Sequence, residues 1–191
     1  MPSSLNAEQI ARYQQDGLLW PLPALSAGQT RTLYERYRTQ ASGIKGRSNQ
    51  KPHLLYTWLD EVVRSPGILD AVESLLGPDL LCWSSQFFSK PAGDPAYVSW
   101  HQDATYWGLS SNDVATAWVA LTPSTRESGC MEVVKGSHHH QVKHEDRFDE
   151  ANLLSRGQEI AVKVDPDTVT PVELQPGEMS LHHRSEEHTS E

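Results

Sequence analysis

The segment QFFSKPAGDPAYVSWHQDATYWGL, residues 86–109, contains a histidine and a carboxylate two positions apart, His101 and Asp103. Side chains in a β-strand repeat with a period of two residues, so we expect these two groups to point to the same side. Such a pair can occupy adjacent corners of the shell around a divalent metal ion. A third ligand from a distant part of the chain would complete the two-histidine, one-carboxylate set that holds non-haem Fe(II) and leaves positions open.

The composition is that of an ordinary globular domain. The chain has 191 residues, of which 37% are hydrophobic and 21% charged, enough for one domain with a sizeable core. The net charge of -9 argues against a nucleic-acid surface, and no apolar run is long enough for a membrane span. The N-terminus lacks the pattern of a signal peptide. Cys82 and Cys130 form no disulfide framework, so we expect a cytoplasmic protein in which both are small buried hydrophobes.

The first part of the chain has the pattern of helices. Asn6 is a capping residue for a helix that ends before Gly17, and Ser26 caps a second helix. The predicted elements are a helix at 6–16, a short strand at 17–22, a helix at 27–40, and a mostly helical segment at 54–76 that is broken at 65–67.

After residue 78 the pattern changes to short runs rich in β-forming residues, separated by proline and glycine. The predicted strands are 80–83, 86–88, 97–100, 115–121, 131–134, 160–164 and 169–174, with a short helix at 148–156. Helices followed by many short strands favour an α+β fold, or a β-barrel or jelly roll with helices packed outside it.

Several separated motifs resemble one family. They are Ser89-Lys90-Pro91, Trp100-His101-Gln102-Asp103 with Tyr106-Trp107, the run AWVAL at 117–121, Gly129-Cys130-Met131, Gly136-Ser137-His138, and PGEMSLHH at 176–183. In this order and spacing, over most of the chain, they are similar to the phytanoyl-CoA dioxygenase family of Fe(II)- and 2-oxoglutarate-dependent oxygenases. The resemblance implies a mainly β fold with N-terminal helices, a double-stranded β-helix (a cupin-like jelly roll) with the metal near one mouth.

The resemblance also implies roles for individual residues. His101 and Asp103 match the first two iron ligands, leaving room for 2-oxoglutarate and O2 as co-substrates. Related halogenases carry a small residue at the position of Asp103, so the carboxylate favours hydroxylation. Lys90 matches a position that reaches towards the co-substrate, although a solvated loop lysine would look the same. Trp118 is assigned to the barrel interior beside the co-substrate.

Other residues near these motifs have plainer interpretations. Met131 is expected in the barrel interior, and Gln102 should point away from the metal if its strand is regular. Tyr106 and Trp107 are either walls of the substrate pocket or ordinary core. The remaining histidines are expected on the surface (His138, His139, His140 and His144) or in a structural role (His53).

The third ligand is assigned by position. Counting forward from the PGEMSLHH motif, the distal histidine of the family falls on His188. The residues before it, Arg184 to Glu187, are too polar for a buried site. His183 is the alternative ligand, and His182 would then face the opposite way on a strand.

The tail offers a further explanation. Residues 184–191, RSEEHTSE, are the in-frame translation of AGATCGGAAGAGCACACGTCTGAA, the start of a widely used sequencing adapter. We therefore expect one oxygenase domain at 1–183, incomplete at its C-terminus and lacking its last strands, followed by a non-native tail at 184–191. The family's arginine that clamps 2-oxoglutarate would also be absent, since it follows the distal histidine.

Three interpretations follow for function. The first is an Fe(II)/2-oxoglutarate-dependent dioxygenase that hydroxylates a small organic substrate, without nucleic-acid or membrane partners. The second is a non-catalytic jelly roll that binds a metal or ligand. The third is that this chain is an inactive fragment of the enzyme. His101 and Asp103 together favour the enzyme over the binding protein, because a binding barrel does not need both.

Overall fold

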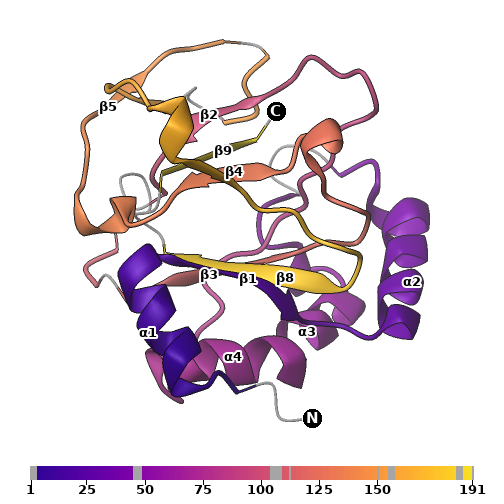
Figure 1. Cartoon of the computed structure of the whole chain (residues 1–191). Helices are drawn as coiled ribbons and strands as arrows, with labels where there is room; N and C mark the ends of the chain where they lie inside the picture. Colours follow the sequence, from indigo (N-terminus) through magenta and orange to yellow (C-terminus); the bar gives the residue numbers. More distant parts are fainter. Residues whose placement is uncertain are drawn as a thin grey trace.

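The computed structural model describes residues 4–44, 49–103, 109–111, 113–149, 151–154, 158–183 and 187–190. In Figure 1 two antiparallel sheets face each other, and helices cover the outer side of one of them. The helices are α1 (Ala7–Asp16), α2 (Ala27–Arg36), α3 (Thr57–Val63) and α4 (Pro66–Leu76), and a π-helical turn (Tyr37–Ala41) follows α2. The strands are β1 (Leu18–Pro23), β2 (Val98–His101), β3 (Ala115–Val119), β4 (Met131–Val134), β5 (His144–Asp146), β6 (Gln158–Ile160), β7 (Val169–Pro171), β8 (Glu178–His183) and β9 (Glu187–Ser190).

The strand order explains the layers. One sheet has the order β1-β8-β3 and the facing sheet the order β2-β9-β4-β7, while β5 and β6 form a separate pair. Neighbours in the sheets are distant in sequence, as a roll requires. The predicted jelly roll with helices outside it agrees with this arrangement.

The N-terminal helices begin where their capping residues predict. The Asn6 side chain accepts the Gln9 backbone N–H while the Gln9 side chain accepts that of Asn6, and Ser26 does the same with Gln29. Gly17 ends α1 in the left-handed conformation, at φ 71°. These local signals are confirmed, although α2 proper is shorter than the predicted 27–40.

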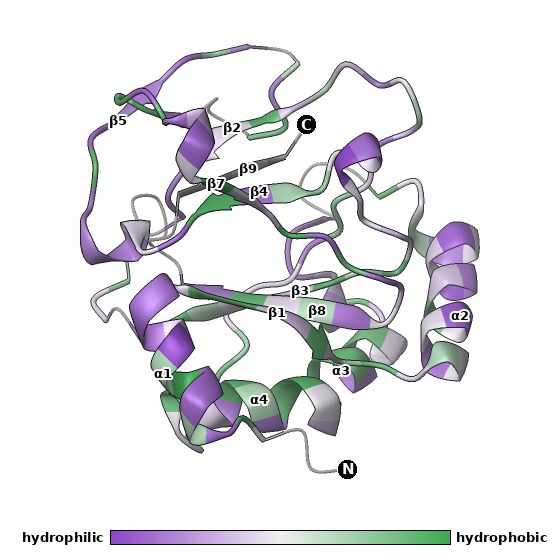
Figure 2. Cartoon of the chain, viewed as in Figure 1, coloured by the Kyte–Doolittle hydropathy of each residue, from purple (hydrophilic) through white to green (hydrophobic). Residues whose placement is uncertain are grey.

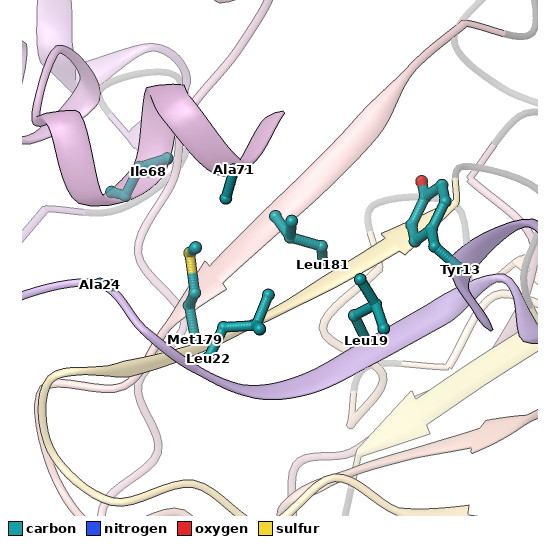
Figure 3. Close-up of a cluster of buried hydrophobic side chains, with 8 residues drawn as sticks. All are labelled: Tyr13, Leu19, Leu22, Ala24, Ile68, Ala71, Met179 and Leu181. Atoms are coloured by element: carbon teal, nitrogen blue, oxygen red, sulfur yellow. The ribbon is translucent and has the colours of Figure 1, made fainter. Parts of the chain in front are cut away.

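A hydrophobic core joins the three-stranded sheet to the helices. Met179 and Leu181 of β8 are fully buried and face Ile68 and Ala71 of α4, as Figure 3 shows. The apolar residues of α4 are prominent in Figure 2, on the helix that lies along this sheet. Burying side chains of this size stabilises a fold by about 1.5–3 kcal/mol each. Because strand residues alternate, Ser180 and His182 must face the other sheet.

A second core fills the space between the two sheets. It contains Leu18, Ala120, Met131, Val133, Val172 and Leu174, with Trp20 and Trp118 packed against it. Met131 is 3% exposed. The predicted interior positions of Met131 and Trp118 are therefore confirmed.

The segments 80–83 and 86–88 are not strands, contrary to the prediction. A strand needs a backbone ladder with a neighbour. In this segment the Phe87 backbone N–H donates to the side-chain oxygen of Asn49, and the Asn49 amide donates to the Phe87 carbonyl, both at 2.9 Å. A side chain thus takes the place that a neighbouring strand would occupy.

The prediction of a helix at 148–156 is also wrong, because none of the residues that the structure describes in this range is helical. The Asp149 carboxylate accepts the Ala151 backbone N–H and the Tyr97 hydroxyl, both at 2.9 Å. Aspartate side chains that bond nearby backbone groups in this way favour turns over helices. The segment instead lies against the start of β2, where Tyr97 forms a bridge with Asn152.

The two cysteines were both expected to be buried, and only one of them is. Cys130 is buried, at 3% exposure, whereas Cys82 is exposed and not the buried hydrophobe that was predicted. Cys82 lies on the segment that forms no strand, so no neighbouring layer covers it. Among the helices of the described residues, none is long and apolar enough to cross a bilayer.

Candidate metal centre

His101 and Asp103 lie together where β2 ends. The ring Nδ1 of His101 donates to the Ser99 carbonyl at 2.9 Å, because a carbonyl can only accept. That bond directs Nε2 to the other side of the ring, where it lies 3.2 Å from Oδ1 of Asp103. The two side chains are only 6% and 17% exposed. The predicted same-side arrangement is present, although Asp103 lies just beyond the last strand residue.

The donor set of this pair fits a divalent cation. With one ring proton on Nδ1, Nε2 faces a carboxylate oxygen and is an acceptor whenever it carries no proton of its own. Two acceptors this close attract only if they share a proton or a metal ion. Adjacent corners of an octahedron with bonds of about 2.1 Å lie about 3 Å apart. The separation of 3.2 Å between Nε2 and Oδ1 therefore suits two neighbouring ligand positions.

A second histidine, His182, reaches this centre from the facing sheet. It is 1% exposed, and burial lowers its pKa to about 4; the charge of Asp103 opposes the shift, while those of His101 and His183 add to it. His182 is therefore neutral at pH 7 and close enough to the pair for their charges to act on it.

The alternative ligand, His183, occupies the other face of β8. Its ring lies 5.1 Å from that of His138, and its backbone N–H donates to the Gly17 carbonyl. The alternative assignment of His183 would have His182 facing away from the metal, and the structure has the opposite orientation. The reason is the strand phase: Met179 and Leu181 face the helices, so His183 shares their side and His182 faces the roll interior.

The predicted distal ligand, His188, is described only by its backbone. It lies on β9, directly opposite His101 of β2 and Val133 of β4 in the antiparallel register. The side chain of His188 lies outside the described residues, as do Tyr106 and Trp107. Within the part of the chain that the structure describes, no group of three histidine, cysteine or acidic residues is arranged to hold a metal.

The two residues assigned to co-substrate binding lie near one aromatic contact. Trp118 of β3 is opposite Ser180 in the register, and its ring lies 5.3 Å from that of Phe88. Lys90 follows Phe88 by two positions and is half-buried. The structure thus brings the Trp118 region and the Lys90 segment together, and their part in binding stays a prediction.

Sequence reasoning missed the contacts around Gln102. This residue is fully buried between the two predicted ligands, and its backbone N–H donates to Nε2 of His144 at 2.8 Å. His144 was expected on the surface but is half-buried, and burial lowers its pKa, with the nearby His101 adding to the shift and the Val142 carbonyl opposing it. No local signal could have revealed this pairing of residues 42 positions apart.

Two other histidines bond the end of α1. The ring Nε2 of His138 donates to the Gln14 carbonyl and that of His139 to the Gln15 carbonyl, both at 3.2 Å. His53 is buried, with Nδ1 2.6 Å from the Ser85 hydroxyl, as its predicted structural role requires.

Solved structures define the class of protein. The chain aligns with a structure described as "non-heme monooxygenase; ThoJ apo" at a TM-score of 0.82 and 37% identity, covering 95% of this chain and 70% of that one. It aligns with "CytC3 with Fe(II) and alpha-ketoglutarate" at a TM-score of 0.68 and 25% identity, covering 100% of this chain and 72% of that one. The fold of this chain is that of these non-haem oxygenases.

Sequence comparison defines the family. The model for "Phytanoyl-CoA dioxygenase (PhyH)" matches residues 1–191, and the chain belongs to this family. Over 151 residues it is 31% identical to the L-proline trans-4-hydroxylase of Streptomyces griseoviridis, covering 67% of this chain and 53% of that protein. Over 142 residues it is 28% identical to a Stutzerimonas stutzeri protein named "Probable alpha-ketoglutarate-dependent hypophosphite dioxygenase", covering 73% and 49% respectively. The chain spans about half the length of these curated relatives.

Proposed function

We propose that the protein is an Fe(II)- and 2-oxoglutarate-dependent dioxygenase that hydroxylates a small organic substrate. The observation that carries the proposal is the pair of His101 Nε2 and Asp103 Oδ1, 3.2 Å apart at the end of β2, with His101 buried and Asp103 mostly buried. Family membership and the Fe(II)- and 2-oxoglutarate-bound structural relative support it. When bound, Fe(II) with 2-oxoglutarate and O2 would supply the oxidant that removes hydrogen from the substrate.

The residues of this chain would hold and orient these groups. His101 presents Nε2 because the Ser99 carbonyl holds Nδ1–H, and Asp103 supplies the neutralising carboxylate. We assign His188 as the third ligand, because its backbone lies opposite that of His101 on the adjacent strand. Lys90 and Trp118 are assigned to 2-oxoglutarate. The oxygen and imidazole donors suit Fe(II), and three protein ligands leave room for a bidentate co-substrate and O2.

We also propose that residues 184–191 are a non-native tail and that the intact enzyme continues differently after His183. The adapter translation supports this, and so does the polar stretch Arg184 to Glu187 before the third ligand position. In that case the 191-residue chain lacks the arginine partner for 2-oxoglutarate and has little activity of its own. Sequencing the locus from intact genomic DNA tests the proposal, which fails if the same codons are found there.

One experiment separates the enzyme from a binding jelly roll. The protein with its genomic continuation is mixed anaerobically with Fe(II) and 2-oxoglutarate, and the visible spectrum is recorded. We expect a weak charge-transfer band that the His101→Ala variant lacks, together with 2-oxoglutarate turnover in air. If neither the band nor turnover occurs, the non-catalytic binding protein is favoured. Normal turnover by the printed chain would instead overturn the proposal that it is an inactive fragment.

A further inference from the structure

Gln102 is a fully buried polar residue whose side chain is satisfied at both ends. Its Oε1 accepts the Val142 backbone N–H at 3.0 Å, and its Nε2 donates to the His140 carbonyl at 2.9 Å. Burying an amide is unfavourable unless it is hydrogen-bonded, so these bonds fix the direction of the side chain. The segment 137–142 is thereby attached to the residue that separates the two proposed ligands.

The backbone of Gln102 is held as firmly as its side chain. Its N–H donates to Nε2 of His144 at 2.8 Å, and Nδ1 of His144 lies 3.0 Å from the Val142 carbonyl. Because a carbonyl only accepts and Nε2 is already an acceptor, the His144 proton is on Nδ1. The His144 ring, in this one tautomer, therefore connects the start of β5 to the backbone that follows β2.

These contacts act at the point where the metal pair is least constrained by the sheet. β2 ends at His101, and Asp103 lies outside any strand. Among the torsions that bring His101 and Asp103 together are those of the single residue between them, Gln102. Fixing the N–H and the side chain of Gln102 therefore restrains the backbone between the two groups. Groups that orient metal ligands commonly change affinity by about 10–100-fold when they are removed.

We propose that Gln102 and His144 are positioning residues that fix the His101–Asp103 pair for metal binding. This inference rests on the proposed function of the pair, and it adds that the loop at 137–144 controls the geometry of the centre. Neither residue touches the metal or the substrate in this role.

The test uses Co(II) as the probe and three variants of the loop. His144→Ala removes the acceptor for the Gln102 N–H, His144→Gln supplies an amide oxygen in its place, and His140→Ala is the matched control, because the His140 side chain is exposed on the same loop. We expect the Co(II) dissociation constant, measured by calorimetry, to rise about 10–100-fold in His144→Ala. It should stay close to the wild-type value in His144→Gln and in His140→Ala.

A second measurement separates positioning from simple loss of structure. Amide hydrogen exchange at Gln102 should accelerate in His144→Ala, and NMR couplings should show that the His101 side chain has changed its χ1 angle. Faster exchange at Gln102 with unchanged Co(II) affinity and unchanged His101 couplings would overturn the inference. Gln102→Leu removes the acceptor for the Val142 N–H and the donor to the His140 carbonyl without adding a charge, so it should weaken Co(II) binding even if His144→Ala fails to fold.

Failure of the proposed function would give a different result. If wild-type and His101→Ala protein bind Co(II) equally weakly, then the pair is not a metal centre. The His101 couplings in the metal-free protein then decide the positioning role alone: altered values in His144→Ala support it, and wild-type values refute it.

Discussion

Nε2 of His101 lies 3.2 Å from Oδ1 of Asp103, with both side chains mostly withdrawn from water. If this pair holds the metal, then removing either donor should lower affinity severely. We expect His101→Ala and Asp103→Asn each to raise the Co(II) dissociation constant by about 100-fold or more, since removing groups that only orient ligands already costs about 10–100-fold. Asp113→Asn, an exposed acid in the 109–115 connection, is the control and should bind as the wild type does. Equal affinity in all four proteins, measured by calorimetry, would exclude the pair as a metal centre.

His182 should make the stability of the metal-free protein depend on pH. Its pKa is about 4 in the folded chain and near 6.5 in the unfolded chain, so the unfolded state binds more protons between these values. The contribution of neutral His182 is fully present above pH 6.5 and is lost as the pH falls towards 4. The loss should approach about 3 kcal/mol, because each pH unit in this window is worth about 1.4 kcal/mol.

The measurement for His182 is the free energy of unfolding in urea at several pH values, for the wild type and for His182→Phe, which cannot titrate. We expect the wild-type value to fall relative to the variant as the pH is lowered from 6.5 to 4. A constant difference across this range would show that His182 titrates normally in the folded protein. His140→Ala, which removes an exposed histidine, should follow the wild type.

Gly177 should tolerate no side chain. Its φ is 93°, and an added Cβ would lie 2.7 Å from the Leu25 carbonyl oxygen and 2.8 Å from the Thr30 hydroxyl oxygen. We expect Gly177→Ala to lower the free energy of unfolding by about 2–4 kcal/mol, from backbone strain and a steric clash together. Gly28→Ala is the matched control: Gly28 lies in α2 with open space around it, so alanine should raise stability by about 0.5–1 kcal/mol. Chemical denaturation of both variants checks the prediction, and similar effects of the two changes would contradict it.

Deleting residues 184–191 should damage the four-stranded sheet. β9 lies between β2 and β4, so its removal leaves two unpaired strand edges. We expect the shortened chain to melt at a lower temperature and to aggregate on heating, as circular dichroism and light scattering would show. A melting temperature equal to that of the printed chain would mean that β9 adds nothing to the sheet.

The helices could be predicted because their signals are local. Asn6, Gly17 and Ser26 each act on residues within four positions, and the break between α3 and α4 falls at Ser65-Pro66 as expected. The pair formed by His101 and Asp103 could be predicted for the same reason.

Most of the failures depend on partners far away in the sequence, although the turn at Asp149 that replaces the predicted helix at 148–156 is local. The segments 80–83 and 86–88 have β-forming residues, but propensity alone cannot supply a neighbouring strand. The orientation of His182 and His183 depends on which face of β8 meets the helices, and a shift of one residue would reverse it. The hydrogen bond from the Gln102 backbone to the His144 ring joins residues 42 positions apart. Histidine is often partly exposed, so nothing in the local sequence indicated that this ring would be half-buried.

The last four carbonyls of α1 all have donors, and three of those donors come from residues 136–139. The Gly17 N–H donates to the Tyr13 carbonyl, and the Gly136 N–H donates to the Asp16 carbonyl. The rings of His138 and His139 donate to the carbonyls of Gln14 and Gln15, which lie 124 positions away in the sequence. A ten-residue helix is marginal by itself. During synthesis, the final turn of this helix therefore gains these partners only after residues 136–139 have left the ribosome.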